Sequence, residues 1–348
     1  MTHLKGTISI EPQGKQNLRN SLYDLNTPPK LLISIITPVH NCYSHNEIFL
    51  ESLKKYSFFP YQLIIIDNNS TDGSTELFQK AECQIISNKK NLCYPESINL
   101  GLAHARGEYI CLLNNDVYCG LNWDKHLIDG MTMYNLDVVS PCGIERMPTL
   151  PLTHLFSQRW RKVGEKRHIG SDTEDLGQIL FAMYGDWPEF CNKIYERYYS
   201  QIIEGIVGNC VFLKRSVLEK IGLLDERIQS ADWDIYLRIK KRAEEIGDVH
   251  RVMTICWSYV HHFIRTTLKS NPAPFACTHS RYDLQEKWDK ETIRRLWPFS
   301  YEVNERPSFC RQPIRYWKYK WQKVESRRIR TENENQWVQF WKQKQGRP

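Results

Sequence analysis

Three polar clusters in the first third of the 348-residue chain carry side chains suited to binding a charged ligand, and each follows a short apolar run. PVHN at 38–41 follows LLISIIT, DNNS at 67–70 follows QLIII, and NND at 114–116 follows YICLL. Apolar runs of this length are typical of buried parallel strands, whose carboxyl ends lie at one edge of an open α/β sheet. The clusters are therefore predicted to converge on one pocket, which we interpret as a site for a nucleotide diphosphate.

The elements that must position these clusters alternate regularly between apolar runs and amphipathic stretches. This alternation is typical of α/β proteins. Residues 145–205 break the rhythm with several aromatic and basic residues and three prolines, and such an insertion is expected to shape the side of the site that faces an acceptor. The pattern predicts strands near 32–37, 62–66, 84–87, 108–113 and 137–140, and helices near 45–57, 74–81, 95–105 and 123–134.

The two ends of the chain differ from this central region. Residues 1–30 show no sustained period and are predicted to form an N-terminal extension or linker. Residues 269–348 form a basic, aromatic-rich C-terminal extension, in which 311–331 combine many Lys and Arg side chains with Trp and Tyr. Two interpretations of this segment remain open: a helix packed on the main domain, or an element that binds a membrane surface peripherally.

Composition excludes several classes of protein. With 41% hydrophobic residues, 25% charged residues and a net charge of +7, the chain can bury a large core and accept phosphate-bearing substrates. Its eleven cysteines contain no C-x-x-C pair, so a disulfide framework and a zinc site are not indicated. No apolar run approaches the roughly 20 residues that span a bilayer. We expect a cytoplasmic location, with peripheral membrane contact through the C-terminal extension as an option. We expect no nucleic-acid partner, because no base-reading motif is present.

Five motifs in order resemble those of a family 2 glycosyltransferase of the GT-A fold. They are TPVHN, DNNSTDGS, the stretch 99–116, GNCVFLKRSVLEKIGLLDE and ADWDIYLRI. The resemblance covers 31–268, with a nucleotide-binding half at 31–143 and an acceptor and catalytic half at 144–268. It implies an α/β fold with a Rossmann-like mixed, mainly parallel sheet flanked by helices, followed by a helical C-terminal extension.

The resemblance also implies an activity: transfer of a sugar from a nucleotide-sugar, most often a UDP- or dTDP-sugar, to the hydroxyl of a saccharide acceptor. That acceptor would belong to a polysaccharide, a lipid-linked glycan or a glycoprotein. The alternative is a catalytically silent protein that binds nucleotide or carbohydrate, because Asn114 and Ala231 replace acidic residues of the family motifs. A sugar nucleotidyltransferase is disfavoured because no Gly-rich phosphate loop follows the first predicted strand.

The donor side of the implied site consists mainly of residues at or after the ends of the first, second and fourth predicted strands, together with Asn99 on the helix that precedes the fourth. Asp67 can accept a hydrogen bond from the base or ribose, and Asn114 can hydrogen-bond the ribose. A simpler interpretation, with Asp67 and Asn69 as ordinary turn and cap residues, remains open. The implied donor-binding residues are Thr37, Pro38, His40, Asn41, Asp67, Asn69, Asn99, Asn114 and Asn115.

A divalent cation, Mn²⁺ or Mg²⁺, is the implied cofactor. By the resemblance, Asp116 binds it at the last position of the DxD-like NND cluster. A histidine supplies a further ligand: His262 is preferred, and His261 remains an alternative. A packed core histidine is the competing interpretation for either residue.

The stretch ADWD at 231–234 resembles the family's ED-x-D motif, which implies that Asp232 is the general base. A single base without a carboxylate nucleophile implies one direct displacement, with inversion at the anomeric carbon. Trp233, Asp234 and Asn209 are the implied residues on the acceptor side. The competing interpretation is that Asp232 only caps the helix that begins there.

Overall fold

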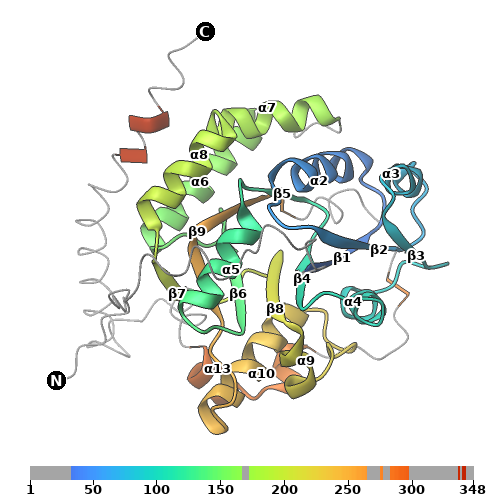
Figure 1. Ribbon diagram of the computed structural model, residues 1–348, viewed down its shortest axis with the longest axis vertical. Helices are drawn as coiled ribbons and strands as arrows, with labels where there is room; N and C mark the ends of the chain where they lie inside the picture. The colour runs from blue at the N-terminus through green and yellow to red at the C-terminus, as the bar shows by residue number, and fades with distance from the viewer. Residues whose placement is uncertain are drawn as a thin grey trace, which may run out of the picture.

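The computed structural model describes residues 33–166, 172–264, 275–276, 283–297, 336–337 and 339–341. Within them, nine strands form one sheet in the order β3-β2-β1-β4-β8-β6-β9-β5, and β7 pairs with β9 (Figure 1). The strands are β1 (Ile33–Val39), β2 (Tyr61–Asp67), β3 (Gln84–Ser87), β4 (Tyr109–Leu113), β5 (Val117–Cys119), β6 (Val138–Cys142), β7 (Ile202–Glu204), β8 (Cys210–Lys214) and β9 (Met253–His262).

The sheet is mixed. Strands β1 to β4 pair in parallel with one another, β6 pairs in parallel with β9, and β5, β7 and β8 pair antiparallel to their neighbours. Strands β1, β2, β3, β4, β6 and β9 therefore all run in one direction. This confirms the predicted class, an α/β protein with a mixed, mainly parallel sheet.

Helices cover both faces of the sheet because β1 and β2 are apolar on both sides. Alternate residues of a strand point to opposite faces. Ile33 and Ile35 pack with residues of α2, α3 and α5, whereas Ile36 packs with residues of α4, α9 and α10. The helices are α2 (Tyr43–Tyr56), α3 (Ser74–Lys80), α4 (Tyr94–Leu102), α5 (Trp123–Met133), α6 (Leu150–Lys166), α7 (Thr173–Tyr184), α8 (Trp187–Tyr198), α9 (Arg215–Ile221), α10 (Ala231–Glu245), α12 (Leu284–Lys287) and α13 (Lys290–Leu296).

The insertion that interrupts the regular alternation forms α6, α7 and α8. Figure 1 shows these helices together on one side of the molecule, and α9, α10 and α13 together at the opposite end. Phe156 and Phe190 of the insertion pack on Tyr259 of β9, and Trp337 from the C-terminal part joins the same aromatic cluster. The insertion thus supports the strand that carries both candidate metal-ligating histidines.

The predicted elements of the first half agree closely with those observed. The main omission is β5, a strand of three residues that the sequence analysis did not predict. The helical C-terminal part is confirmed by α12 and α13. The predicted extension at 1–30 and the basic segment 311–331 lie outside the described residues. None of the described helices combines the length and the apolar composition that crossing a membrane requires.

Gly107 permits the close approach of the turn before β4 to β1, and this contact provides a test of the fold. A Cβ at Gly107 would lie 2.5 Å from the backbone nitrogen of Ser34 and 2.7 Å from the carbonyl carbon of Ile33. Because the obstacle is backbone, Gly107→Ala should lower the free energy of unfolding by about 1–3 kcal/mol, measured by urea denaturation.

The matched control is Gly177→Ala in α7, where a Cβ would meet no atom within 4 Å. Alanine favours a helix over glycine by roughly 0.5–1 kcal/mol, so this variant should be more stable than the wild type. Equal stability of the two variants would contradict the close packing of the turn on β1.

Candidate active site

The three predicted polar clusters lie at one edge of the sheet. The parallel register places Val39 beside Asp67 and Ile36 beside Leu112, so the carboxyl ends of β1, β2 and β4 are neighbours. The convergence expected from the sequence is therefore present in the structure.

Side-chain amides connect the loops at this edge. The Asn115 amide donates to the Asn46 side-chain oxygen at 2.7 Å, and the Asn46 amide donates to the Asn41 carbonyl at 2.9 Å. Asn41 in turn receives a hydrogen bond from the Thr71 backbone at 2.7 Å. Asn41 has a φ of 57°, a conformation that asparagine tolerates better than most residues. This chain of hydrogen bonds holds three loops in fixed relation.

The remaining donor-side residues divide into structural and accessible groups. Asp67 accepts from the Ser70 backbone at 3.1 Å and from the Thr75 hydroxyl at 3.0 Å, so both of its oxygens help to order the turn. His40 contacts the Asn68 carbonyl at 2.8 Å. By contrast, Asn69 is exposed and has a φ of 65°.

Thr37 and Pro38 lie within β1 itself, where Pro38 is the register partner of Ile66. The hydroxyl of Thr37 is buried and has no hydrogen-bond partner among the described residues. An unpaired buried hydroxyl is costly, so this atom is the stronger candidate of the two for contact with a ligand or a bound water.

Asn99 lies apart from these residues. From α4, its amide donates to the Leu224 carbonyl at 2.9 Å and to a Glu226 carboxylate oxygen at 3.0 Å, and its oxygen accepts from the Leu224 backbone at 3.0 Å. This arrangement anchors the loop after α9, so the geometry favours a structural role for Asn99 over nucleotide contact.

Asp116 and His262 meet because β5 pairs antiparallel with β9. The register places Val117 opposite His262, and the Asp116 carboxylate lies 3.1 Å from His262 Nε2. On the other side of the imidazole, His262 Nδ1 lies 3.1 Å from both carboxylate oxygens of Glu145. Burial by itself lowers the pKa of His262, but Asp116 and Glu145 outweigh it and raise that pKa to about 10.

The Asp116 and His262 atoms fit the demands of a divalent cation. Two ligand atoms at about 2.1 Å from a metal and at a right angle lie about 3 Å apart, as these two do. Glu145 on the second nitrogen would orient the imidazole, as carboxylates commonly do for metal-bound histidines. Among the described residues no group of three His, Cys, Asp or Glu side chains is arranged around a metal position. Phosphate oxygens and water commonly complete the coordination of a divalent cation that has few protein ligands.

His261 occupies the opposite face of β9 and does not reach this position. It is fully buried, hydrogen-bonded to the Tyr184 hydroxyl at 2.8 Å, and packed against Trp160. Burial lowers its pKa to about 3, so it stays neutral. The geometry favours His262 as the metal ligand and His261 as a core residue.

Asn209 and Asn114 join the acceptor half to the nucleotide half. The Asn114 backbone donates to the Asn209 carbonyl at 3.0 Å, and the Asn209 amide donates to Glu145. The side-chain oxygen of Asn209 is buried and lacks a partner among the described residues. Asn209 is thus held beside the Asp116–His262 pair with one polar atom unused.

Asp232 lies in the first turn of α10, two residues after the N-cap Ser230. It packs so closely on Gly208 that a Cβ there would lie 2.0 Å from Asp232 Oδ2. Burial raises the pKa of Asp232 to about 6, with the Glu145 charge adding to the rise, although hydrogen bonds from the Trp233 and Asp232 amides oppose it. A carboxylate with such a pKa is a suitable general base near neutral pH.

The neighbours of Asp232 in sequence differ in their surroundings. Trp233 is 39% exposed, and its indole packs on Trp297. Asp234 is fully buried and accepts from Arg238 Nε at 2.9 Å and from the Trp288 indole at 2.8 Å. The acceptor-side role of Asp234 stays a prediction, and the geometry favours a structural one.

The sequence analysis did not identify Glu145 or Asn46 as site residues, and Gly208 entered it only as the first residue of the motif GNCVFLKRSVLEKIGLLDE, without a role of its own. Glu145 follows β6, which runs in the same direction as β1 and β4, so the rule applied to the first three clusters could have indicated it. Asn46 lies inside a helix, where local sequence carries no clear signal for it, and the close contact of Gly208 with Asp232 depends on the absence of a Cβ.

Together these features define an α/β protein with a carboxylate–histidine pair and a second, base-like carboxylate near the carboxyl edge of its sheet. The profile described as "Glycosyl transferase family 2" matches residues 34–222, which is more than half of the chain. The chain therefore belongs to glycosyl transferase family 2.

Curated relatives match over shorter regions. The glycosyltransferase GlyG of Streptococcus pneumoniae is 25% identical over 113 residues, which cover 31% of this chain and 38% of GlyG. The UDP-Glc:alpha-D-GlcNAc-diphosphoundecaprenol beta-1,3-glucosyltransferase WfaP of Escherichia coli is 32% identical over 90 residues, covering 25% of this chain and 36% of WfaP. The chain thus spans little more than a third of the length of these relatives.

Solved structures show a distant likeness. The mannosyltransferase PcManGT of Pyrobaculum calidifontis, solved with GDP-Man and Mn²⁺, has a TM-score of 0.44 at 15% identity and covers 70% of this chain and 62% of its own. S. aureus TarS 1–349 in complex with UDP has a TM-score of 0.42 at 13% identity, with coverages of 83% and 70%.

The contact between Gly208 and Asp232 yields a test. In Gly208→Ala the added methyl should push the Asp232 carboxylate out of place. On the implied role of Asp232 as general base, nucleotide release from a nucleotide-sugar should then fall by about 100-fold, since misplacement of a reacting group by an ångström costs this much. Thermal melting should change little, because the carboxylate is the far end of a side chain that can rotate. Unchanged turnover would show that the position of Asp232 does not matter.

Proposed function

We propose that this chain is an inverting glycosyltransferase that moves a sugar from a nucleotide-diphosphate sugar to an acceptor hydroxyl. The observation that carries the proposal is the 3.1 Å distance between the Asp116 carboxylate and His262 Nε2, at the sheet edge where the loops after β1 and β2 also begin. Family membership supports the reaction class, since the matched segment contains both loops and Asp116.

The donor would bind with its nucleotide over the loops after β1 and β2 and its diphosphate at Asp116 and His262. The amide network that fixes Asn41, Asn46 and Asn115 would make this surface rigid before the donor arrives, which reduces the entropy lost on binding. The E. coli relative is named for UDP-glucose and a diphosphoundecaprenol-linked sugar. We therefore propose a UDP-sugar donor and a saccharide acceptor of a lipid-linked glycan or polysaccharide.

Mn²⁺ or Mg²⁺ is the proposed cofactor, held by Asp116 and His262. When bound, the cation neutralises negative charge that develops on the departing nucleotide diphosphate. Metal binding requires a neutral imidazole, so His262 would release its proton, while Glu145 would keep the ring aimed at the metal position.

Asp232 is the proposed base. Its carboxylate would take the proton from the acceptor hydroxyl as that oxygen attacks the anomeric carbon from the face opposite the leaving nucleotide. One displacement without a covalent intermediate inverts the anomeric configuration. The exposed indole of Trp233 would lie beside the incoming sugar, which fits the aromatic lining common in ligand sites.

The metal assignment predicts that Asp116→Ala loses Mn²⁺ binding, measured by isothermal titration calorimetry, together with metal-dependent nucleotide release. The residual His262 would be a single ligand, too few for firm binding of a hard cation. The control is Asp129→Ala on α5, where the carboxylate pairs with Lys125 across one helical turn. Equal Mn²⁺ affinity in the two variants would remove Asp116 from the metal site.

The base assignment predicts that Asp232→Asn lowers kcat by roughly 10²- to 10⁴-fold while the dissociation constant for the donor stays within a few-fold of wild type. A base must be ionised, so wild-type kcat should fall as pH drops below about 6, the pKa to which burial raises Asp232. A catalytically silent binding protein would instead bind the donor and release no nucleotide at any pH. Loss of donor affinity with kcat retained would make Asp232 a binding residue.

A further inference from the structure

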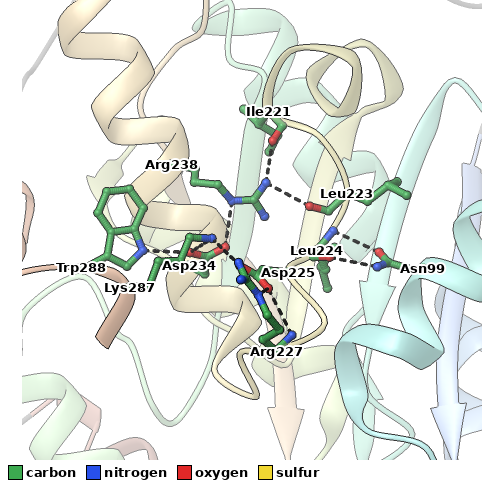
Figure 2. Close-up of polar contacts among 10 residues, drawn as sticks. All are labelled: Asn99, Ile221, Leu223, Leu224, Asp225, Arg227, Asp234, Arg238, Lys287 and Trp288. Atoms are coloured by element: carbon green, nitrogen blue, oxygen red, sulfur yellow. Dashed lines mark hydrogen bonds and ion pairs between the residues drawn. The ribbon is translucent and has the colours of Figure 1, made fainter. Parts of the chain in front are cut away.

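The segment 283–297 lies against the first turn of α10, the turn that carries Asp232. This segment contains α12 and α13 and lies beyond the family match, which ends at residue 222. Figure 2 shows Lys287 and Trp288 converging on Asp234 from one side while Arg238 approaches from the other.

Asp234 is the centre of these contacts. One carboxylate oxygen accepts from the Trp288 indole at 2.8 Å and pairs with Lys287 Nζ at 2.9 Å, and the other pairs with Arg238 Nε at 2.9 Å. Asp234 is fully buried, and a buried carboxylate is stable only when it is paired and hydrogen-bonded. The C-terminal segment supplies two of these three partners.

The same contacts extend to the loop between α9 and α10. Lys287 Nζ also lies 2.9 Å from Asp225, and Arg238 donates to the carbonyls of Ile221 and Leu223 at 2.6 and 3.0 Å (Figure 2). This loop leads directly into the first turn of α10. The segment 283–297 therefore holds the turn and the chain that enters it.

Trp233, which lies between Asp232 and Asp234 in sequence, is held by the same segment. The ring centroids of Trp233 and Trp297 lie 3.6 Å apart, and Trp297 also contacts Tyr236 at 5.4 Å. The two residues that follow Asp232 in sequence are thus both fixed by 283–297, one by hydrogen bonds and charge and the other by ring packing.

We propose that Lys287 and Trp288 are positioning residues for Asp232, and that the C-terminal segment 283–297 sets the placement of the proposed base. The inference rests on the proposed function for its catalytic meaning. Its geometric content, that these contacts keep the first turn of α10 pressed against Gly208, can be tested without turnover.

Asp232 is half-buried and faces groups from several elements. Glu145 after β6 and Tyr94 of α4 lie close enough to interact with it electrostatically, and Gly208 contacts it directly. If Lys287 or Trp288 no longer holds the turn, more water will reach the half-buried carboxylate, and the burial that raises its pKa to about 6 will weaken. The titration of Asp232 should then move to lower pH.

The experiment uses the full chain in four variants: Lys287→Met, Trp288→Phe, Lys287→Arg and, as a control, Lys290→Met at an exposed position of α13. Carbon-13 NMR of labelled aspartate, with the Asp232 signal identified by its absence in Asp232→Asn, gives the titration midpoint. Lys287→Met and Trp288→Phe should lower the midpoint relative to wild type, whereas Lys287→Arg and Lys290→Met should leave it in place. Trp288→Phe keeps an aromatic ring but removes the indole N–H donor and part of the ring volume, so it provides a second, independent variant if Lys287→Met does not fold.

Turnover supplies the second readout. In Lys287→Met and Trp288→Phe, kcat for nucleotide release from the UDP-sugar that the wild type uses best should fall about 10- to 100-fold, with little change in donor affinity. The low-pH fall in kcat should move with the NMR midpoint. A variant that melts at lower temperature but keeps both the wild-type midpoint and the wild-type low-pH fall would overturn the positioning role and leave a purely structural one.

Failure of the proposed function has a different signature. If the wild type releases no nucleotide from any UDP-sugar, yet the midpoint still moves in Lys287→Met, then the positioning of Asp232 stands and its catalytic role does not. If the wild type is active and the midpoint does not move in either variant, the proposed function stands and the role of 283–297 is refuted.

Discussion

The antiparallel pairing of β5 with β9 is the constraint on which the candidate site depends. Strands β1, β2 and β4 bring their loops to one edge by parallel pairing, but this alone places no histidine beside Asp116. Because Val117 is the register partner of His262, Asp116 lies next to the imidazole. Since successive side chains of a strand alternate between faces, the same register directs His261 into the core. A shift of one residue would exchange the two histidines.

Buried charge explains why regions distant in sequence cooperate here. His262 lies between two carboxylates, one from the end of β4 and one from the loop after β6, which stabilise its charged form. Asp234 carries its negative charge among Arg238, Lys287 and the Trp288 indole. Removing one partner from such a group leaves an uncompensated charge, which commonly costs about 3–5 kcal/mol. Both halves of the domain and the C-terminal segment are thereby tied to the same region.

The helical insertion and the C-terminal aromatic residues pack against the end of β9 that carries His262. Trp160, Phe263 and Tyr184 surround His261, and Phe263 also donates its backbone amide to the Asp116 carbonyl. The aromatic packing therefore continues directly into the residue that is proposed to bind the metal. This layer would give the end of β9 a rigid support while leaving the opposite face of the strand to the site.

The sequence by itself determined the class of fold and the location of the first half of the site. Apolar runs and amphipathic stretches are local patterns, so the strands and helices up to residue 142 were predicted within a few residues, apart from the short strand β5. The clusters containing Asn41, Asp67 and Asp116 were found because polar residues after parallel strands must share an edge. The motif resemblance to family 2 glycosyltransferases indicated Asp232 as well.

Only the tertiary structure decided which of these residues face one another. The family resemblance favoured His262, but the register of β9 against β5, which no local pattern encodes, is what places His262 rather than His261 beside Asp116. The structural positions of Asn99 and Asp234 depend on partners 125 and 54 residues away in sequence, Leu224 and Trp288. Gly208 leaves room for the Asp232 carboxylate because it has no Cβ, and Glu145 contacts the imidazole of His262, which is 117 residues away in sequence. Such contacts between distant residues arise from how strands pair and charges are compensated on folding, so they could not be predicted from sequence patterns alone.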